Sequence, residues 1–256
     1  MIRKLLLTFA FAVSCAGVSQ NPFYKFGCVE DEALWAVWVW DVSLIKLAKE
    51  NFERAIKEWG IRRVYVQLGE ELDLETVEYL KDLSLEIFVV EGGNDVREVF
   101  NPEKAIYLEA DGYQIDLEPY TNSDFWVRKA YYLRAYLEKL KEIKERLGGV
   151  KFSVVIPHWF DRVEFSRRSL ARQVFELADE VVVMAYREKI TRALGLVSKE
   201  VKLSAKYGKP LILGIEVIYT EGADTIPVSI DELKRLRGLR CRGIEGFALQ
   251  NIEGIL

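Results

Sequence analysis

Apolar residues fall into two kinds of block that alternate along the chain from about residue 33 onward. Short blocks rich in Val, Ile and aromatic residues have the length of strands, at residues 36–40, 63–68, 86–90, 112–117, 151–157, 180–186, 211–217 and 246–249. Blocks between them carry apolar residues at helical spacing, at residues 45–59, 74–83, 96–108, 124–147, 169–177, 190–207 and 230–236. This alternation is typical of parallel βαβ units.

The number of strand–helix units favours a closed barrel over an open sheet. About eight units in roughly 240 residues match the (β/α)8 TIM barrel, which typically has about 250 residues. A doubly wound sheet normally has a Gly-rich phosphate loop after its first strand, and Trp40-Asp41-Val42-Ser43 is not one. We therefore predict a single α/β domain, a (β/α)8 TIM barrel over residues 33–256. Its functional residues should lie at the carboxyl ends of the strands.

Residues 1–20 have the pattern of an export signal. A short basic start is followed at residues 5–13 by an uncharged, mostly apolar run, which is too short to span a bilayer as a helix. The run ends in Ala-Val-Ser-Cys, which resembles a lipobox with Cys15 as the acylated residue. We expect an exported protein, either anchored to the cell membrane as a lipoprotein through Cys15 or secreted.

Composition and charge narrow the function classes. The 36 Lys and Arg against 40 Asp and Glu give a net charge of −4, which excludes a strongly basic nucleic-acid binder. The single His158 has no Cys near it in the sequence, so we expect no metal site, and we expect no cofactor. Cys28 and Cys241 lie near opposite ends of the domain, and the sequence leaves open whether they form a disulfide or remain thiols.

The fourth predicted strand carries a pair of acids. Its sequence and exit read DGYQIDLEPY, and alternation along a strand places Gln114, Asp116 and Glu118 on one face. The apolar residues of the other face should pack against the helices, so the polar set should face the barrel interior. Confinement of two carboxyls raises the pKa of one of them, and Glu118, nearest the mouth, is the natural proton donor. The structural alternative is a buried ion pair, for which Arg187 is the matching inward cation.

Four strands together resemble a known family. DGYQIDLE resembles the DGxDxDxE signature of the family 18 glycoside hydrolases, the chitinase-type barrels, with Gln114 in the place of the middle acid. Residues 181–187 are similar to the family's MxYD strand, with Arg187 in place of Asp or Asn. Residues 90–93 are similar to SxGG without its Ser, and Gln250 stands where a Trp usually forms the pocket floor. The resemblance covers roughly residues 36–255 in strand order.

The resemblance implies a substrate-assisted hydrolysis of an amino-sugar polysaccharide or glycan. In this route the 2-acetamido oxygen of the sugar attacks its own anomeric carbon. Glu118 would protonate the leaving oxygen, Asp116 would hold the acetamido nitrogen, and Tyr186 would donate its hydroxyl to the acetamido oxygen. The alternative for Tyr186 is a packed residue of the barrel.

Two other functions stay open. Glu216 follows the seventh strand, and Glu118-Pro119 is similar to the Glu-Pro of a group of retaining barrel glycosidases that place a nucleophilic Glu there. A Glu118/Glu216 pair about 5–5.5 Å apart would suit a retaining double displacement. Alternatively, the departures at Gln114, Arg187 and Gln250 suit a non-catalytic carbohydrate-binding barrel at the cell envelope.

A carbohydrate partner calls for polar and aromatic side chains around the mouth. Some of these side chains face inward by alternation along a strand, and others come directly after a strand. The binding candidates chosen in this way are Gln114, Glu216, Gln250, Trp40, Gln67, Trp159 and Arg187. The segment between the seventh and eighth strands is short, roughly 28 residues, so we expect an open or shallow pocket.

Overall fold

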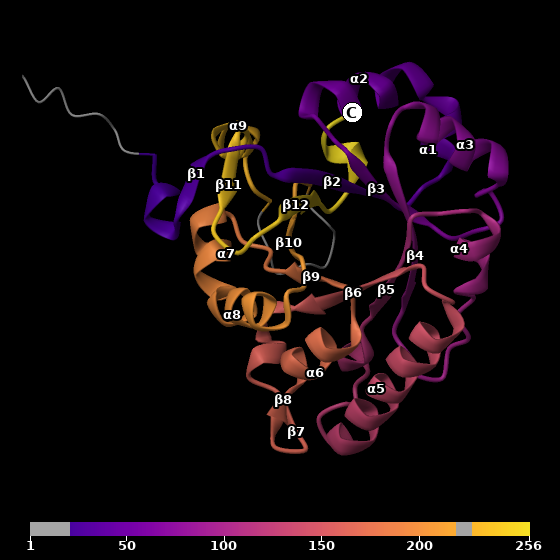
Figure 1. Ribbon diagram of the computed structural model, residues 1–256, viewed down its shortest axis with the longest axis vertical. Coiled ribbons are helices and arrows are strands. Elements are labelled where there is room, and N and C mark those ends of the chain that lie inside the picture. The colour runs from indigo at the N-terminus through magenta and orange to yellow at the C-terminus, as the bar shows by residue number, and fades with distance from the viewer. Residues whose placement is uncertain (1–20, 219–226) are drawn as a thin grey trace, which may run out of the picture.

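The computed structural model describes residues 21–218 and 227–256, so the predicted signal segment and Cys15 lie outside the described residues. Eight parallel strands close into a barrel in the order β10-β12-β2-β3-β4-β5-β6-β9, with helices around it (Figure 1). This confirms the predicted (β/α)8 barrel. The barrel strands are β2 (Leu34–Val39), β3 (Arg63–Gln67), β4 (Glu86–Gly93), β5 (Gly112–Leu117), β6 (Lys151–Pro157), β9 (Glu180–Met184), β10 (Leu211–Ile215) and β12 (Gly246–Leu249).

The helices cover the outside of the barrel. They are α1 (Ser43–Leu47), α2 (Lys49–Trp59), α3 (Leu74–Asp82), α4 (Glu103–Tyr107), α5 (Lys129–Arg146), α6 (Leu170–Leu177), α7 (Ile190–Leu196), α8 (Ser198–Tyr207) and α9 (Ile230–Leu236). The helices expected at 45–59 and 190–207 are each divided in two, at Ala48 and Val197, whose backbones leave the helical region. The helix expected at 96–108 is confined to α4, because Pro102 cannot continue a helix in the N-terminal direction.

Two segments outside the barrel pair at its amino-terminal end. Strand β1 (Cys28–Glu30) runs antiparallel to β11 (Leu239–Cys241), and the register places Cys28 opposite Cys241. The two cysteines form a disulfide, which settles the alternative that the sequence left open. Short elements complete the fold: η1 (Tyr24–Phe26), η2 (Pro119–Thr121), η3 (His158–Asp161), η4 (Ile252–Gly254), β7 (Glu164–Phe165) and β8 (Arg168–Ser169). Within the two described ranges, no helix has both the length and the apolar character needed to cross a bilayer.

The apolar core has two layers because strand side chains alternate between the barrel interior and the helices. The outer layer lies between strands and helices. The inner layer is a smaller cluster that includes Trp38, Tyr65 and Phe88. At Gly112, a Cβ would lie only 2.2 Å from the Phe88 ring, so glycine is needed there for the ring to fill the barrel.

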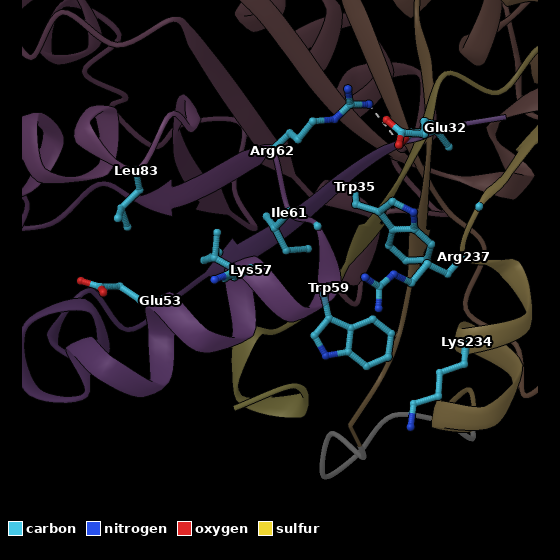
Figure 2. A pocket seen from close by; sticks show the side chains of 14 residues that line it. Glu32, Trp35, Glu53, Lys57, Trp59, Ile61, Arg62, Leu83, Lys234 and Arg237 are labelled. Carbon is cyan, nitrogen blue, oxygen red and sulfur yellow. Dashed lines mark hydrogen bonds between the residues drawn. The ribbon is translucent and has the colours of Figure 1, made fainter.

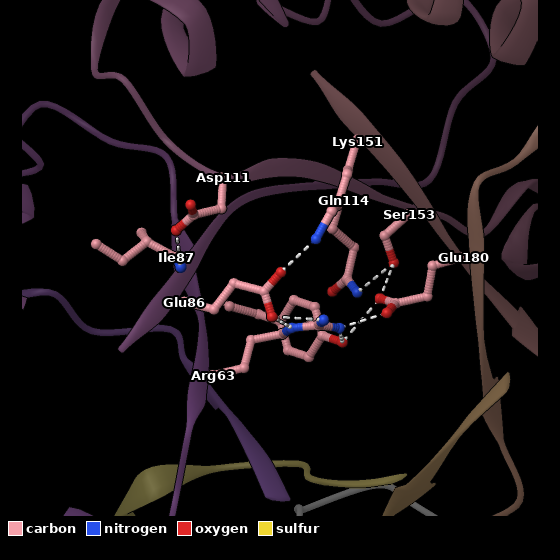
Figure 3. Close-up of polar contacts among 9 residues, drawn as sticks. Arg63, Glu86, Ile87, Asp111, Gln114, Lys151, Ser153 and Glu180 are labelled. Carbon is pink, nitrogen blue, oxygen red and sulfur yellow. Dashed lines mark hydrogen bonds and ion pairs between the residues drawn. The ribbon is translucent and has the colours of Figure 1, made fainter. Parts of the chain in front are cut away.

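Charged and polar residues fill the amino-terminal end of the barrel, and we call this set the polar floor (Figure 3). Arg63 forms ion pairs with Glu180 and Glu86, the latter at 2.6 Å, and Lys151 Nζ lies 2.7 Å from Glu86. Glu180 also accepts hydrogen bonds from the hydroxyls of Tyr65 at 3.0 Å and Ser153 at 2.9 Å. Each buried carboxylate of the floor therefore has a cation beside it. The members of the floor are Arg63, Tyr65, Glu86, Lys151, Ser153 and Glu180.

Candidate active site

Asp116 and Glu118 lie at the carboxyl end of β5, at the opposite end of the barrel from the polar floor. Two backbone contacts fix the position of Glu118. Its N–H donates to the carbonyl of Gly93 at the end of β4 (2.7 Å), and its carbonyl accepts from the N–H of Thr121 (3.1 Å). A side chain at Gly93 would meet a Glu98 carboxylate oxygen at 2.6 Å and the Phe100 ring at 3.0 Å, so glycine leaves room there for the segment that follows β4. Proline at 119 then ends the strand and opens the turn η2.

The acid pair is held without a cation. Asp116 Oδ1 is buried and has no hydrogen-bond partner within the described ranges. Burial and the adjacent charge of Glu118 raise the pKa of Asp116 to about 8. Burial also raises the pKa of Glu118, and a hydrogen bond from the hydroxyl of Tyr120 opposes that shift. The alternative of a buried ion pair at this position is not observed, since no described Lys or Arg forms an ion pair with either acid.

Tyr186 follows β9 and lies within electrostatic range of three carboxyls. Burial and the charges of Asp116, Glu118 and Glu216 raise the pKa of its hydroxyl well above the usual value. A Cβ at Gly214 would lie 3.5 Å from the Tyr186 ring, so the ring packs against β10 at this place. Glu216, just after β10, is itself buried. The structure therefore brings these four predicted site residues together.

Gln114 lies one layer below the acids and does not line the mouth. Its side chain is fully buried, accepts a hydrogen bond from the Trp38 indole N–H (2.6 Å) and donates one to the Ser153 hydroxyl (3.0 Å). Both ends of the amide are thus occupied inside the barrel. This corrects the expectation that Gln114 contacts a ligand: its contacts join the acid pair's strand to the polar floor.

Three other predicted binding residues lie at the ends of neighbouring strands. Trp40 follows β2, Gln67 ends β3 and Gln250 follows β12, and these strands are adjacent in the barrel. The Trp40 indole donates to the Gln250 carbonyl oxygen (3.1 Å), while the side-chain Oε1 of Gln250 is buried with no partner in the described part of the chain. The Gln67 amide makes one long contact, to the Leu68 carbonyl at 3.4 Å. All three side chains are partly exposed at the mouth.

Arg187 turns toward the exit of β6. Its guanidinium donates to the Tyr186 carbonyl (2.5 Å), and its Nη2 lies 3.3 Å from His158 Nε2. His158 in turn donates to the carbonyl of Met184, and burial together with the charge of Arg187 lowers the pKa of His158. Arg187 is therefore tied to the backbone that carries Tyr186. It positions that tyrosine in addition to any contact with a ligand.

Aromatic rings extend from the acid pair to the surface, and we call Tyr120, Trp159 and Trp126 the aromatic ledge. The centroids of Tyr120 and Trp159 are 5.0 Å apart, and those of Trp159 and Trp126 are 6.0 Å apart. Trp126 has 61% of its surface exposed. Of these three residues, only Trp159 was predicted from the sequence. Tyr120 continues the alternation of Asp116 and Glu118 by two residues, which is a signal that could have found it.

A further tyrosine approaches the acids from the helix layer. The hydroxyl of Tyr136, on α5, is buried without a partner in the described ranges, and burial together with the charges of Asp116 and Glu118 raises its pKa. Its ring packs edge-on against Phe160, at a centroid distance of 5.9 Å. No group of three or more His, Cys, Asp or Glu residues with the geometry of a metal site occurs among residues 21–218 and 227–256.

No protein-family model matches the chain, and no curated protein is similar to it in sequence. Solved structures do resemble it. A class V chitinase from Pseudomonas fluorescens Pf-5 has a TM-score of 0.50 and 11% identity, over 88% of this chain and 96% of that one. The chain therefore has the (β/α)8 barrel fold, which it shares with this chitinase.

Other solved structures resemble the chain as closely as this chitinase does. A protein from Aquifex aeolicus VF5 has a TM-score of 0.51 and 15% identity, over 90% of this chain and 87% of that one. A racemase from Streptomyces coelicolor A3(2) has a TM-score of 0.50 and 8% identity, over 90% of this chain and 59% of that one. Because such barrels host unrelated chemistries, these similarities establish the fold, and function must be argued from the site.

Proposed function

We propose that this chitinase-type barrel is an exported glycoside hydrolase-like protein that cleaves an amino-sugar polysaccharide or glycan by acid catalysis. The observation that carries the proposal is the pair Asp116 and Glu118 at the mouth, with no ion pair to either acid among the described residues. A carboxyl whose pKa is raised to about 8, as for Asp116, keeps a proton in the pair at neutral pH. General acid catalysis needs a proton held in this way.

The arrangement suits a substrate-assisted reaction. The acetamido oxygen of the bound sugar attacks the anomeric carbon, while Asp116 accepts a hydrogen bond from the acetamido nitrogen and Tyr186 donates one to the acetamido oxygen. Glu118 gives its proton to the leaving glycosidic oxygen as the bond to the anomeric carbon breaks. Glu118, now a carboxylate, then removes a proton from the water that opens the cyclised intermediate, which returns the enzyme to its starting state.

A retaining double displacement through Glu216 is the second candidate. It is supported by the position of Glu216, which is buried just after β10 and within electrostatic range of Tyr186, as Asp116 and Glu118 are. In that reaction Glu216 would attack the anomeric carbon and form a glycosyl ester, and Glu118 would act as acid and then as base.

Export and lipid anchoring are part of the proposal. The disulfide between Cys28 and Cys241 supports an oxidising compartment, since such bonds persist mainly outside the cytosol. We expect the mature chain from native membranes to begin at an acylated Cys15, as measured by intact mass. An unprocessed Met1 in a cytosolic fraction would contradict this.

The test of the chemistry is Glu118→Gln, which keeps the size of the side chain and removes the proton. On whichever of chitin oligomers, peptidoglycan or deacetylated chitin is turned over, kcat should fall by about 10²–10⁴-fold with folding unchanged. Glu70→Gln is the matched control, because Glu70 is exposed beyond the end of β3 and should leave kcat unchanged. Full turnover by Glu118→Gln would show that another group is the acid.

Two reagents separate the two mechanisms. A thiazoline analogue of the cyclised intermediate should bind far more tightly than the parent sugar if the reaction is substrate-assisted. A 2-fluoro sugar should label Glu216 covalently if the reaction is a double displacement, and peptide mass mapping would locate the adduct. Binding of a glycan with no turnover and no response to either reagent would instead indicate a non-catalytic carbohydrate-binding barrel.

A further inference from the structure

A run of basic residues lies in the last fifth of this acidic chain. Residues 234–242 contain five Lys or Arg and no acid, although the whole chain has a net charge of −4. All five side chains are exposed, at the end of α9 and along β11. Arg240 is paired with Glu245 (2.9 Å) and Asp31 (3.7 Å). The other four have no ion pair within the described ranges.

The run borders an open groove of about 780 Å3 (Figure 2). Lys57 on α2 and Arg62 before β3 line the groove together with Lys234 and Arg237. Two acids also line it, and one of them, Glu53, accepts a hydrogen bond from the Tyr79 hydroxyl (2.8 Å). We call the exposed cations in and beside the groove the basic edge: Lys57, Arg62, Lys234, Arg235, Arg237 and Arg242.

The basic edge is joined to the place where the N-terminal segment meets the barrel. The disulfide links Cys28 to Cys241, which lies inside the basic run. The backbone N–H of Arg242 also donates to the carbonyl of Gly27 (3.2 Å). Two exposed apolar side chains lie on the same N-terminal segment, Tyr24 (44% exposed) and Val29 (59% exposed). A segment that leads toward a membrane anchor is thus fastened covalently to a cationic surface.

We propose that the basic edge docks on the anionic phospholipid surface of the membrane, with headgroup phosphates entering the groove. Thirteen peptide units separate Cys15 from Cys28. Even fully extended they span at most about 47 Å, so a lipid on Cys15 keeps Cys28 and the adjoining edge within that distance of the headgroups. Clustered Lys and Arg near an anionic membrane strengthen binding cumulatively, and an exposed Tyr suits the interfacial region. The docking rests in part on the lipid anchor proposed above.

Docking in this way sets the direction of the candidate active site. The groove lies where β2 and β3 begin, whereas Asp116 and Glu118 lie where β5 ends. Because the strands are parallel, a barrel resting on its amino-terminal end turns its mouth away from the bilayer. The mouth then faces glycans outside the membrane.

The test measures binding of the full-length, unlipidated chain to vesicles. Wild-type protein should bind vesicles with about one-third phosphatidylglycerol at least about tenfold more tightly than pure phosphatidylcholine vesicles, and salt should weaken that preference. The apolar segment at residues 5–13 is common to all variants, so neutral vesicles measure its contribution. Lys234→Glu with Arg237→Glu should reduce affinity for the anionic vesicles about 30-fold or more.

The matched control reverses two exposed cations on α5 that form no ion pair with a described residue, Arg134→Glu with Lys141→Glu, which changes the net charge equally. This control should keep nearly all of the binding. Equal losses in both double variants, or no preference for anionic vesicles in the wild type, would overturn the proposal. Loss of binding to soluble polyphosphate with unchanged vesicle binding would assign the edge to a soluble polyanion instead. If the Glu variant does not fold, Lys234→Gln with Arg237→Gln makes the same measurement. None of these outcomes depends on glycosidase activity.

Discussion

At the amino-terminal end of the barrel, the buried carboxylate of Glu180 lies against Arg63 and two hydroxyls, whereas at the carboxyl end Asp116 and Glu118 lie against each other. Both ends take carboxyl groups out of water, which is costly unless the charge is compensated. The floor compensates it with a cation, and the mouth does so by retaining a proton. The cost of burying a carboxyl is therefore met by an ion pair at one end and by a retained proton, the one that the proposed reaction would use, at the other.

The difference explains why the two ends should respond in opposite ways to mutation. At the floor, removal of one partner leaves an unpaired charge in the barrel. At the mouth, removal of a charge relieves a repulsion. The predictions below test this contrast, beginning with the largest expected effect.

Arg63→Met should destabilise the fold by about 3–5 kcal/mol, because it leaves Glu180 buried without a cation. Chemical denaturation followed by circular dichroism measures the change. Arg62→Met is the control, since Arg62 is the exposed neighbour and donates only to the Ala33 carbonyl (3.1 Å); it should cost less than about 1 kcal/mol. A second substitution, Glu180→Met, should recover part of the loss in the Arg63→Met background. Equal losses of unfolding free energy in Arg63→Met and Arg62→Met would show that the ion pair of Arg63 with Glu180 does not stabilise the amino-terminal end of the barrel.

Asp116→Asn should do the reverse and stabilise the fold at alkaline pH. The folded pKa of Asp116 is raised to about 8, so the folded state holds a proton that the unfolded state releases near pH 4. The free energy of unfolding of the wild type therefore decreases as the pH rises from about 4 toward 8. At pH 8 the variant should gain on the order of 2–3 kcal/mol in unfolding free energy, with little difference near pH 4, while turnover falls.

Asp82→Asn is the matched control for that measurement, because Asp82 is exposed at the end of α3. It should change neither stability nor turnover. In the wild type, the same proton predicts that kcat decreases as the pH rises through about 8, since the acid form of the pair is lost. A pH-independent stability difference between Asp116→Asn and wild type would show that charge is not its cause.

The barrel and the acid pair were predictable because they depend on local patterns. Alternation along a strand is fixed by backbone geometry, so DGYQIDLE indicated which face carries Asp116 and Glu118. Depth inside the barrel is not a local property. Gln114 shares that face, yet it lies below the mouth because Trp38 and Ser153, from other strands, occupy both ends of its amide.

Other features also depended on contacts between distant segments. The β1–β11 pair joins residues at opposite ends of the domain, and apart from the cysteine in each segment no local pattern indicates that the two pair as strands. Trp126 was missed for the same reason, because it meets Trp159 only once the segment before α5 lies against η3. The helical spacing of apolar residues continues through Ala48 and Val197, so periodicity alone could not locate the helix breaks at these two residues.

Glu200, in the helix layer, tests whether a buried carboxyl without a cation lowers stability outside the barrel as well. It lies fully buried on α8, and neither carboxylate oxygen has a hydrogen-bond partner in the described ranges. Burial and the charge of Asp161 raise its pKa to about 7. As with Asp116, loss of the Glu200 proton should lower the free energy of unfolding as the pH rises from about 4.5 to 7. Glu200→Gln should therefore stabilise the fold by about 1–2 kcal/mol at pH 8 and have little effect near pH 4.5.

Thermal unfolding at the two pH values measures this difference. Glu145→Gln, an exposed change on α5, should leave the unfolding temperature unchanged at both. A loss of stability in Glu200→Gln at pH 8 would indicate that the carboxylate of Glu200 is compensated by a contact as strong as those of the polar floor.

The smallest expected effect concerns the outer end of the aromatic ledge, where the mouth meets solvent. Sugar rings stack their C–H faces on aromatic side chains, and Trp126 offers such a face at the surface, two ring contacts away from Tyr120. Trp126→Ala should weaken binding of a long oligosaccharide about 5–10-fold, or about 1 kcal/mol, and should leave a disaccharide nearly unaffected. Because the ring is far from the proton of Glu118, kcat should stay within about twofold of wild type. Tyr107→Ala, a change of an equally exposed aromatic residue on α4, is the control for titration by calorimetry. If short and long ligands lose affinity equally, the ledge acts through the shape of the mouth and does not itself extend the binding site.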